Sequence, residues 1–325
     1  MRQKNTIASP FPARQKPLLY GAPRNHPAPP TMHSAQFTHI GIVGKYGASH
    51  LGDTIARVIA TLEARDLSVT LDRNTMPDSW RTHARARPIA DWSDDIDLAV
   101  VIGGDGTFLY AGRSLLDKNI PLLGINTGRL GFLADVPEES LEAHLNRILD
   151  GHYQREQRRI LSVRVTHQGE NTARFYAIND AVIHKRSMAR MIEVDVYARG
   201  QYLSHYRADG LILATPTGST AYALSAGGPI IEPSLDALLV VPICAQTLTQ
   251  RPVVLHADID IDVDISAISK DVQLTIDGQA EHLLNPTDRV HITSAPRLSV
   301  IHPIDYQFQS RLRQKLNWGV APDHP

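Results

Sequence analysis

The chain has 325 residues, 42% hydrophobic and 21% charged, a composition typical of a globular protein with room for two domains. Its 33 basic and 34 acidic residues give a formal charge of −1, so no overall basic field indicates a nucleic-acid or anionic-membrane partner. The single cysteine, Cys244, excludes an internal disulfide framework and a cysteine-rich zinc module. We therefore expect a soluble cytoplasmic protein that binds neither nucleic acid nor membrane.

Residues 1–35 form a basic tail with seven prolines, five basic residues and no acidic residue. Such a segment cannot bury a core, and we expect it to be disordered. One alternative is an organelle transit peptide, although Pro10, Pro12 and Pro17 would break its helix. Another is that translation begins at Met32. Residues 36–325 carry 28 basic and 34 acidic residues, so the near-neutral total conceals a body with a formal charge of −6.

From Phe37 onward, short apolar runs alternate with segments of helical periodicity. The pattern predicts strands at 39–43, 68–71, 97–102 and 121–125, and helices at 51–64, 108–116 and 138–149. Because these strands lack period-two alternation and are separated by helices, they indicate a parallel sheet covered on both faces. We predict that 36–152 form an α/β nucleotide-binding domain with a Rossmann-like sheet.

Strands dominate the sequence after residue 152. The pattern predicts strands at 160–165, 173–183, 192–197, 210–214, 237–241, 259–265, 272–276 and 290–293, with one short helix near 220–225. These features predict a β-rich, sandwich-like second domain over 153–302. A last helix at 306–316, within a terminal segment 303–325, is expected to pack back on the first domain.

The motif GGDGT at 103–107 lies between a buried strand and a helix, where α/β proteins place their ligands. Gly103, Gly104 and Gly106 permit a tight turn whose N–H groups can approach a phosphate at the start of the helix. Asp105 suits phosphoryl transfer, in which a carboxylate takes a proton from an attacking hydroxyl or helps to hold a divalent metal. The alternative is an Asp-Gly turn chosen for its backbone alone.

A second glycine cluster, at 124–133, follows the next predicted strand. Consecutive strands would bring it beside the first loop, where Asn126 could line a ligand cleft. An ordinary loop with glycine breakers explains the cluster equally well.

A third segment, 209–222, runs from a buried strand through a hydroxyl-rich turn into a helix. Free N–H groups and the hydroxyls of Ser219 or Thr220 suit an anion or a ribose, and Tyr222 offers a stacking face to a base. Asn179 and Asp180 could grip a ribose diol or an adenine edge. The alternatives are a simple helix N-cap and an ordinary polar loop.

Together these segments resemble the NAD kinase family, which shares its first motif with diacylglycerol kinases, sphingosine kinases and phosphofructokinases. The resemblance extends from about Phe37 to Trp318. It rests on GGDGT at 103–107, GINTGRLGF at 124–132, IND at 178–180, ARMIEVDVY at 189–197, DGLILATPTGSTAYALSAGGPI at 209–230 and PICAQTLTQRPVV at 242–254. The long TPTGSTAY string favours NAD kinases over the relatives that share only the first motif.

The resemblance implies transfer of the γ-phosphoryl group of ATP to the 2′-hydroxyl of the adenosine ribose of NAD, giving NADP and ADP. It implies Mg²⁺ or another divalent cation. No metal cage is visible in the sequence, so we expect this cation to arrive with ATP. Asp105 would be catalytic, with Gly103, Gly104 and Gly106 near the phosphates. The remaining nucleotide-binding residues would be Asn126, Asn179, Asp180, Arg190, Arg207, Asp209, Thr217, Thr220, Ala221, Tyr222, Ala223, Leu224, Ser225 and Gln279.

Three details depart from this pattern or extend it. Asp180 stands where many family members carry Glu. Arg207, just before Asp209, resembles the proteobacterial form that accepts NAD and rejects NADH. The family's tetramers complete the NAD site across a subunit interface, so we expect a homodimer or homotetramer.

Two other functions fit parts of the sequence. A lipid kinase could use the same glycine loop, but it would require an apolar or basic membrane-facing surface that this composition does not indicate. A non-catalytic NAD or NADP sensor could keep the fold, although the retention of Asp105 and of the glycines argues against lost catalysis.

Overall fold

The computed structural model describes residues 37–128, 131–186 and 190–317, which all belong to one compact unit. The predicted tail at 1–35 and the end of the predicted terminal segment, 318–325, lie outside the described residues. No helix in the described ranges is both long and apolar enough to cross a membrane.

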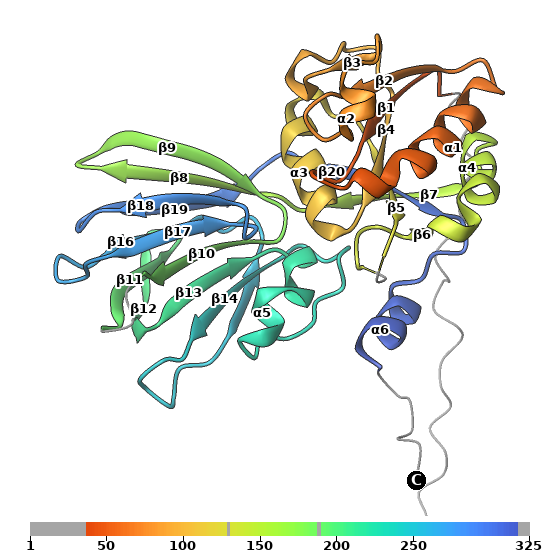
Figure 1. The fold of residues 1–325 in the computed structure, drawn as a ribbon. Coiled ribbons are helices and arrows are strands. Elements are labelled where there is room, and N and C mark those ends of the chain that lie inside the picture. The colour runs from red at the N-terminus through yellow and green to blue at the C-terminus, as the bar shows by residue number, and fades with distance from the viewer. Residues whose placement is uncertain (1–36, 129–130, 187–189, 318–325) are drawn as a thin grey trace, which may run out of the picture. The chain divides into compact units, whose positions relative to one another are not determined.

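The first sheet has the strand order β3-β2-β1-β4-β5-β20-β7, with β6 paired to β5. All its pairs are parallel except β20 with β7 (Figure 1). Its strands are β1 (His39–Val43), β2 (Ser68–Asp72), β3 (Ala86–Arg87), β4 (Leu98–Gly103), β5 (Leu122–Asn126), β6 (Val136–Pro137), β7 (Tyr153–Arg158) and β20 (Leu298–Pro303). The predicted parallel α/β domain is confirmed.

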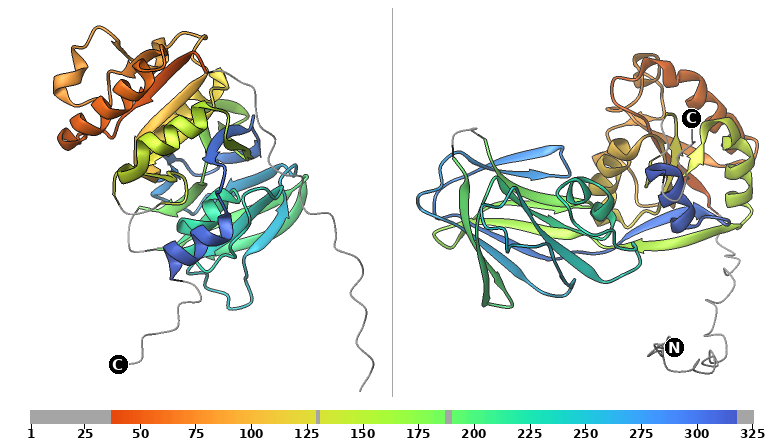
Figure 2. Two further views of the ribbon diagram at one scale, coloured as in Figure 1. Left: turned by 90° about the vertical axis from the view of Figure 1, so that its right-hand side faces the viewer. Right: turned by 90° about the horizontal axis from the view of Figure 1, so that it is seen from below.

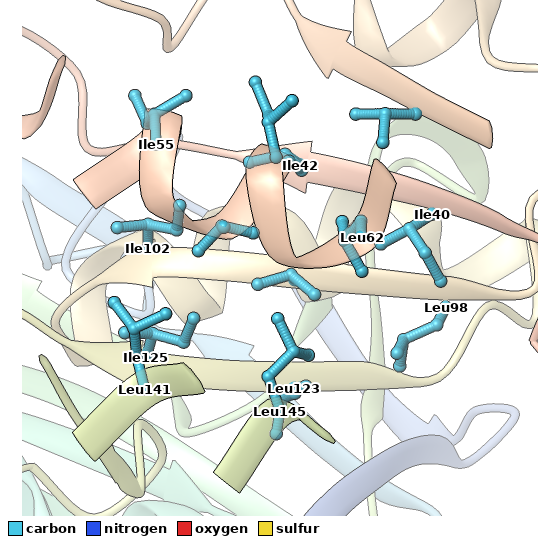
Figure 3. Packing of buried hydrophobic residues seen from close by; sticks show 14 of the residues in the cluster. Ile40, Ile42, Ile55, Leu62, Leu98, Ile102, Leu123, Ile125, Leu141 and Leu145 are labelled. Atoms are coloured by element: carbon cyan, nitrogen blue, oxygen red, sulfur yellow. The ribbon is translucent and has the colours of Figure 1, made fainter. Parts of the chain in front are cut away.

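The helices of this domain form where apolar residues recur at helical spacing. α1 (Gly52–Glu63) and α4 (Leu141–Leu149) pack on one face of the sheet, where Ile55 and Leu145 contact the buried side chains of β1, β4 and β5 (Figure 3). α3 (Asp105–Leu115) packs with a second buried cluster through Phe108 and Leu115. Because the sheet is apolar on both faces, its polar groups gather at the strand ends.

The second domain contains two six-stranded antiparallel sheets, seen as two layers in Figures 1 and 2. Apolar side chains from both sheets form one buried cluster between them. One sheet contains β15 (Val253–His256), β14 (Ala237–Ile243), β13 (Gly210–Ala214), β10 (Asp180–Lys185), β17 (Val272–Ile276) and β18 (Ala280–Leu284). The other contains β12 (Gln201–Ala208), β11 (Ile192–Ala198), β16 (Ile261–Ile265), β19 (Arg289–Ser294), β8 (Leu161–His167) and β9 (Glu170–Ala177). The predicted sandwich-like domain is confirmed.

The last helix, α6 (Phe308–Leu316), contacts the first domain through an ion pair between Arg311 and Asp135 at 3.0 Å. The predicted return of the C-terminal helix is therefore confirmed. The remaining helical elements are short. They are α2 (Asp78–Arg81), α5 (Tyr222–Ser225), and the 3₁₀ turns Ser49–Leu51, Ile89–Asp91, Leu116–Lys118, Glu138–Ser140 and Thr217–Thr220.

The structure differs from the sequence-based prediction at two places that matter for the site. The single strand predicted at 173–183 is two strands, β9 and β10, which belong to different sheets and are separated at residues 178–179. Strands β7 and β20 fall in the range predicted for the second domain but pair within the first sheet, because β20 adds to β5 and β7 adds to β20. The domain boundaries at 36, 153 and 303 stay predictions.

Candidate active site

Asp105 is the first residue of α3 and follows the helix N-cap Gly104. Its carboxylate accepts hydrogen bonds from the backbone N–H groups of Phe132 (2.9 Å), Leu133 (3.0 Å) and Ala134 (3.4 Å). A Cβ atom on Gly131 would lie 2.0 Å from Asp105 Oδ1, so this close approach requires glycine. The sequence did not predict that the second glycine cluster forms a backbone cradle for Asp105.

The two glycine loops adjoin because their strands are neighbours. Gly103 ends β4 and pairs in register with Asn126 at the end of β5, and Thr127 N donates to Gly103 O at 3.4 Å. Asn126 is buried, and its Oδ1 accepts a hydrogen bond from Gly128 N at 2.9 Å. The predicted juxtaposition of the two loops is therefore present, and Asn126 shapes the second loop.

A cavity of about 440 Å³ lies beside the start of α3, and we call it the loop cavity. Lys45 carries a positive charge and the N-terminus of α3 carries a partial positive charge, so this site is favourable for a phosphate. Its lining residues are Gly44, Lys45, Tyr46, Asn74, Thr75, Gly106, Thr107, Tyr110 and Gln279.

The break between β9 and β10 is held by Asp277, whose side chain is fully buried. The Asp277 carboxylate accepts the N–H groups of Ile178 (3.1 Å), Asn179 (2.7 Å) and Asp180 (3.1 Å). On the other side, Thr215 donates its Oγ1–H to Ile178 O at 2.6 Å and its N–H to Asn179 O at 2.9 Å. We call residues 178–180 the nucleotide turn, and its backbone is fixed from two strands at once.

Arg113 links α3 to this region. Its Nη1 lies 2.6 Å from Asp277 Oδ2, and its Nη2 donates to Gln279 Oε1. Gln279 Nε2 in turn donates to Gly106 O at 2.7 Å. One arginine therefore connects the helix that begins at Asp105 with the carboxylate that fixes the nucleotide turn.

A second cavity, of about 480 Å³, lies over the nucleotide turn, and we call it the acidic cavity. Burial, and then the nearby charge of Asp277, raise the pKa of Asp180 to about 7. Asp209 pairs with Lys185 at 2.6 Å. The lining residues are Asn179, Asp180, Val182, His184, Lys185, Asp209, Ala221, Tyr222, Ile243, Thr275, Asp277 and Gly278.

The structure brings together only part of the predicted binding set. Five predicted residues line the acidic cavity, and Gly106 and Gln279 line the loop cavity. The five are Asn179, Asp180, Asp209, Ala221 and Tyr222.

The other residues predicted around the TPTGSTAY string and the two arginines line neither cavity. Thr217 is buried, Ala223 packs in a small apolar cluster, Leu224 is half-buried and Ser225 is exposed. Thr220 donates its hydroxyl to Thr217 O at 3.1 Å. Arg190 is exposed, and Arg207, on β12 of the other sheet, lies 3.5 Å from Glu193. Their contacts with NAD stay predictions.

Sequence reasoning missed Asp277, although it left a local signal. Asp277 and Gly278 both have positive φ (50° and 64°), and Gln279 N donates to Ile276 O at 2.9 Å, as in the Asp-Gly turn of a β-hairpin. The dipeptide indicates the hairpin, whereas the contact with the nucleotide turn depends on the pairing of β10 with β17. The role of the Asp277 side chain therefore depends on tertiary structure and cannot be predicted from the local sequence.

Comparison with known families agrees with this architecture. Residues 40–153 match the model of the ATP-NAD kinase N-terminal domain, and residues 178–302 match the ATP-NAD kinase C-terminal domain. The first match includes Asp105 and the second includes the nucleotide turn.

Individual relatives give the same result. The chain is 41% identical over 290 residues to NAD kinases of Pseudomonas entomophila strain L48 and Pseudomonas putida strain GB-1, which covers 87% of this chain and 97% of each relative. The fold is similar to that of yeast NADH kinase complexed with NADH (TM-score 0.78, 23% identity, 89% of this chain and 90% of that chain). It is also similar to an NAD kinase from Archaeoglobus fulgidus in complex with ATP (TM-score 0.65, 24% identity, 86% and 98%). This two-domain fold is that of a nucleotide-dependent kinase, and the chain belongs to the NAD kinase family.

Proposed function

We propose that this chain transfers the γ-phosphoryl group of ATP to the 2′-hydroxyl of the adenosine ribose of NAD, giving NADP and ADP. The family supports ATP-dependent phosphorylation of NAD. The choice of hydroxyl, the residue roles and the placement of the two substrates are our proposal.

The observation that carries this placement is that residues of one hairpin turn, 277–279, line both cavities. Asp277 lines the acidic cavity, Gln279 lines the loop cavity, and Gln279 also bonds to the backbone of Gly106. We place the adenosine of NAD in the acidic cavity, where Asn179 and Asp180 can accept hydrogen bonds from a ribose diol. ATP then enters the loop cavity with its phosphates toward the start of α3.

Asp105 is the proposed general base, although it lines neither cavity. A carboxylate offers about four lone-pair positions, so three bonds from the cradle leave about one for the ribose hydroxyl. A hydrogen bond from the hydroxyl to that position would orient the oxygen toward the γ-phosphorus and let the carboxylate take the proton as the P–O bond forms. Positioning and electrostatics, rather than covalent chemistry, then supply the rate enhancement.

Magnesium belongs to the substrate in this proposal. Among residues 37–128, 131–186 and 190–317, no group of three or more His, Cys, Asp or Glu side chains is arranged to hold a metal ion. A cation that arrives bound to the ATP phosphates keeps most of its waters and needs few protein ligands. We further propose a cytoplasmic homodimer or homotetramer in which Asp209 and the run 220–225 line the NAD site partly across a subunit interface. Arg190 and Arg207 are proposed as further NAD contacts, with NAD preferred over NADH.

An assay that offers NAD, NADH and diacylglycerol in parallel, each with ATP and Mg²⁺, tests the proposal. We expect NADP as the main product, with NADH a poor acceptor. Phosphatidic acid as the main product would assign the chain to the lipid kinases that share the glycine loop. Nucleotide binding without any phosphorylated product would instead favour a sensor.

A further inference from the structure

The loop that holds Asp105 is itself fastened at its C-terminal end. We call residues 131–135 the cradle loop. Its N–H groups at positions 132–134 bond to Asp105, and its last residue, Asp135, donates its N–H to Gly124 O of β5 at 3.1 Å. The Asp135 side chain is only 2% exposed, so its charge needs partners inside the protein.

Both partners of Asp135 come from the last part of the described chain. Arg311 of α6 lies 3.0 Å from Asp135 Oδ1 and also donates to the Asp135 carbonyl oxygen at 3.3 Å. His302 of β20 bonds through Nδ1 to Asp135 Oδ2. Two side chains that lie more than 160 residues further along the sequence thus fix one aspartate next to the cradle.

The surroundings of His302 favour its charged form. Its Nε2 lies 3.0 Å from Glu156 Oε2, and its ring stacks on Tyr306 with centroids 4.0 Å apart. Glu156 also pairs with Arg158 at 2.9 Å. Burial alone would lower the pKa of His302, but the two carboxylates outweigh burial and raise it. His302 therefore lies between two carboxylates, those of Asp135 and Glu156, which favour its protonated form.

We propose that Arg311 and His302 are positioning residues for the phosphoryl transfer, acting through Asp135 to set the backbone N–H groups that orient the Asp105 carboxylate. The inference rests on the proposed role of Asp105. Asp135 directly follows Ala134, so a shift of Asp135 moves an N–H group that bonds to Asp105. A displacement of about 1 Å at a reacting group can lower a rate about 10²-fold, which makes this support relevant to turnover.

The test uses the full-length protein and two readouts. Arg311→Gln removes the cation, and Arg311→Lys retains it. Arg159→Gln is a matched control, because Arg159 is 11% exposed against 12% for Arg311 and also binds carboxylates, those of Asp236 and Asp258. The readouts are hydrogen exchange at the amides of residues 132–134 and the steady-state kcat and KM for NAD.

We expect Arg311→Gln to speed exchange at these three amides about ten-fold or more and to lower kcat about ten-fold, with KM for NAD changed less than about two-fold. Arg311→Lys should restore most of both values, and Arg159→Gln should change neither. Should Arg311→Gln fail to fold, Asp135→Asn removes the same charge pair at constant shape and carries the same expectation.

Unchanged exchange at residues 132–134 would overturn the inference, as would faster exchange with a normal kcat. A wild-type protein without NAD kinase activity would overturn the proposed function instead. In that case the exchange measurement would still report whether Arg311 fixes the cradle loop, so the two failures are distinguishable.

Discussion

Asp180 shows how burial sets the charge of a single residue in the site. Its carboxyl group lies at the start of β10, buried near the Asp277 carboxylate, and its pKa is raised from 3.8 to about 7. The folded state therefore holds a proton that the unfolded chain has lost between about pH 4 and pH 7. Because the folded pKa is the higher one, Asp180 makes the folded state progressively less stable as pH rises through this window.

Asp180→Asn should relieve this penalty. We expect the variant to be more stable than the wild type by about 1 kcal/mol near pH 4.5 and by up to about 4 kcal/mol at pH 8. Urea unfolding at both pH values measures the difference, with Asp117→Asn, at an exposed helical position, as the charge-loss control. A constant difference between wild type and Asp180→Asn across the pH range would contradict the raised pKa.

The nucleotide turn is the element on which the proposed NAD site depends. A Cβ atom on Gly218 would lie 2.1 Å from Asn179 O and 2.8 Å from Asn179 Cα, so the turn rests directly on the 3₁₀ turn Thr217–Thr220. Gly218→Ala must push the turn backbone away, because neither neighbour is a flexible side chain.

We therefore expect Gly218→Ala to raise KM for NAD ten-fold or more through displacement of Asn179 and Asp180, with a smaller effect on KM for ATP. Gly52→Ala in α1 is the control, since the nearest atom to its added Cβ would be Trp80 Nε1 at 3.8 Å. An unchanged KM for NAD in a folded Gly218→Ala protein would argue against NAD binding at this turn.

At the level of elements, the sequence predicted the apolar strands and the glycine loops but not the break at the nucleotide turn. Residues 173–183 are mostly strand-forming, and the turn-favouring pair Asn179-Asp180 is the only local sign of a break within this run. The break exists because Asp277, which follows β17, and Thr215, which follows β13, form hydrogen bonds with the backbone groups of residues 178–180. Local strand propensity does not predict such long-range hydrogen-bond partners.

The buried ion pair between Arg113 of the first domain and Asp277 of the second connects the two domains at the site. Arg113 is 18% exposed and Asp277 is not exposed at all, so loss of the arginine leaves a buried carboxylate without its counter-charge. We expect Arg113→Met to lower the unfolding free energy by about 3–5 kcal/mol and to raise KM for NAD, because Asp277 fixes the nucleotide turn.

A double-mutant cycle separates this effect from a general loss of packing. Asp277→Asn combined with Arg113→Met removes the uncompensated charge and should recover part of the stability lost in Arg113→Met. Arg57→Met breaks an ion pair with Glu142 whose side chains are 40% and 44% exposed, and should cost less than about 1 kcal/mol. Strictly additive effects of Arg113→Met and Asp277→Asn would contradict the proposed coupling.

The overall architecture was predictable because hydrophobic periodicity specifies a parallel sheet and an antiparallel sandwich. The pairing of β20 with β5 was not, since Leu298–Pro303 lies at the far end of the chain from Leu122–Asn126. This pairing places His302 beside Asp135 and so connects the C-terminal segment to the cradle loop. The body's formal charge of −6 likewise gives no sign of the local cations, Lys45 and Arg113, near the two cavities.

The assignment of Asp105 as general base is the centre of this account, and Asp105→Asn tests it most directly. The substitution keeps the shape of the side chain and removes the base. Single-turnover transfer from γ-labelled ATP to NAD, measured beside the Kd of NAD, separates chemistry from binding. We predict a transfer rate lower by about 10²-fold or more, with a Kd for NAD within about two-fold of wild type. Near-normal transfer by Asp105→Asn would contradict the account.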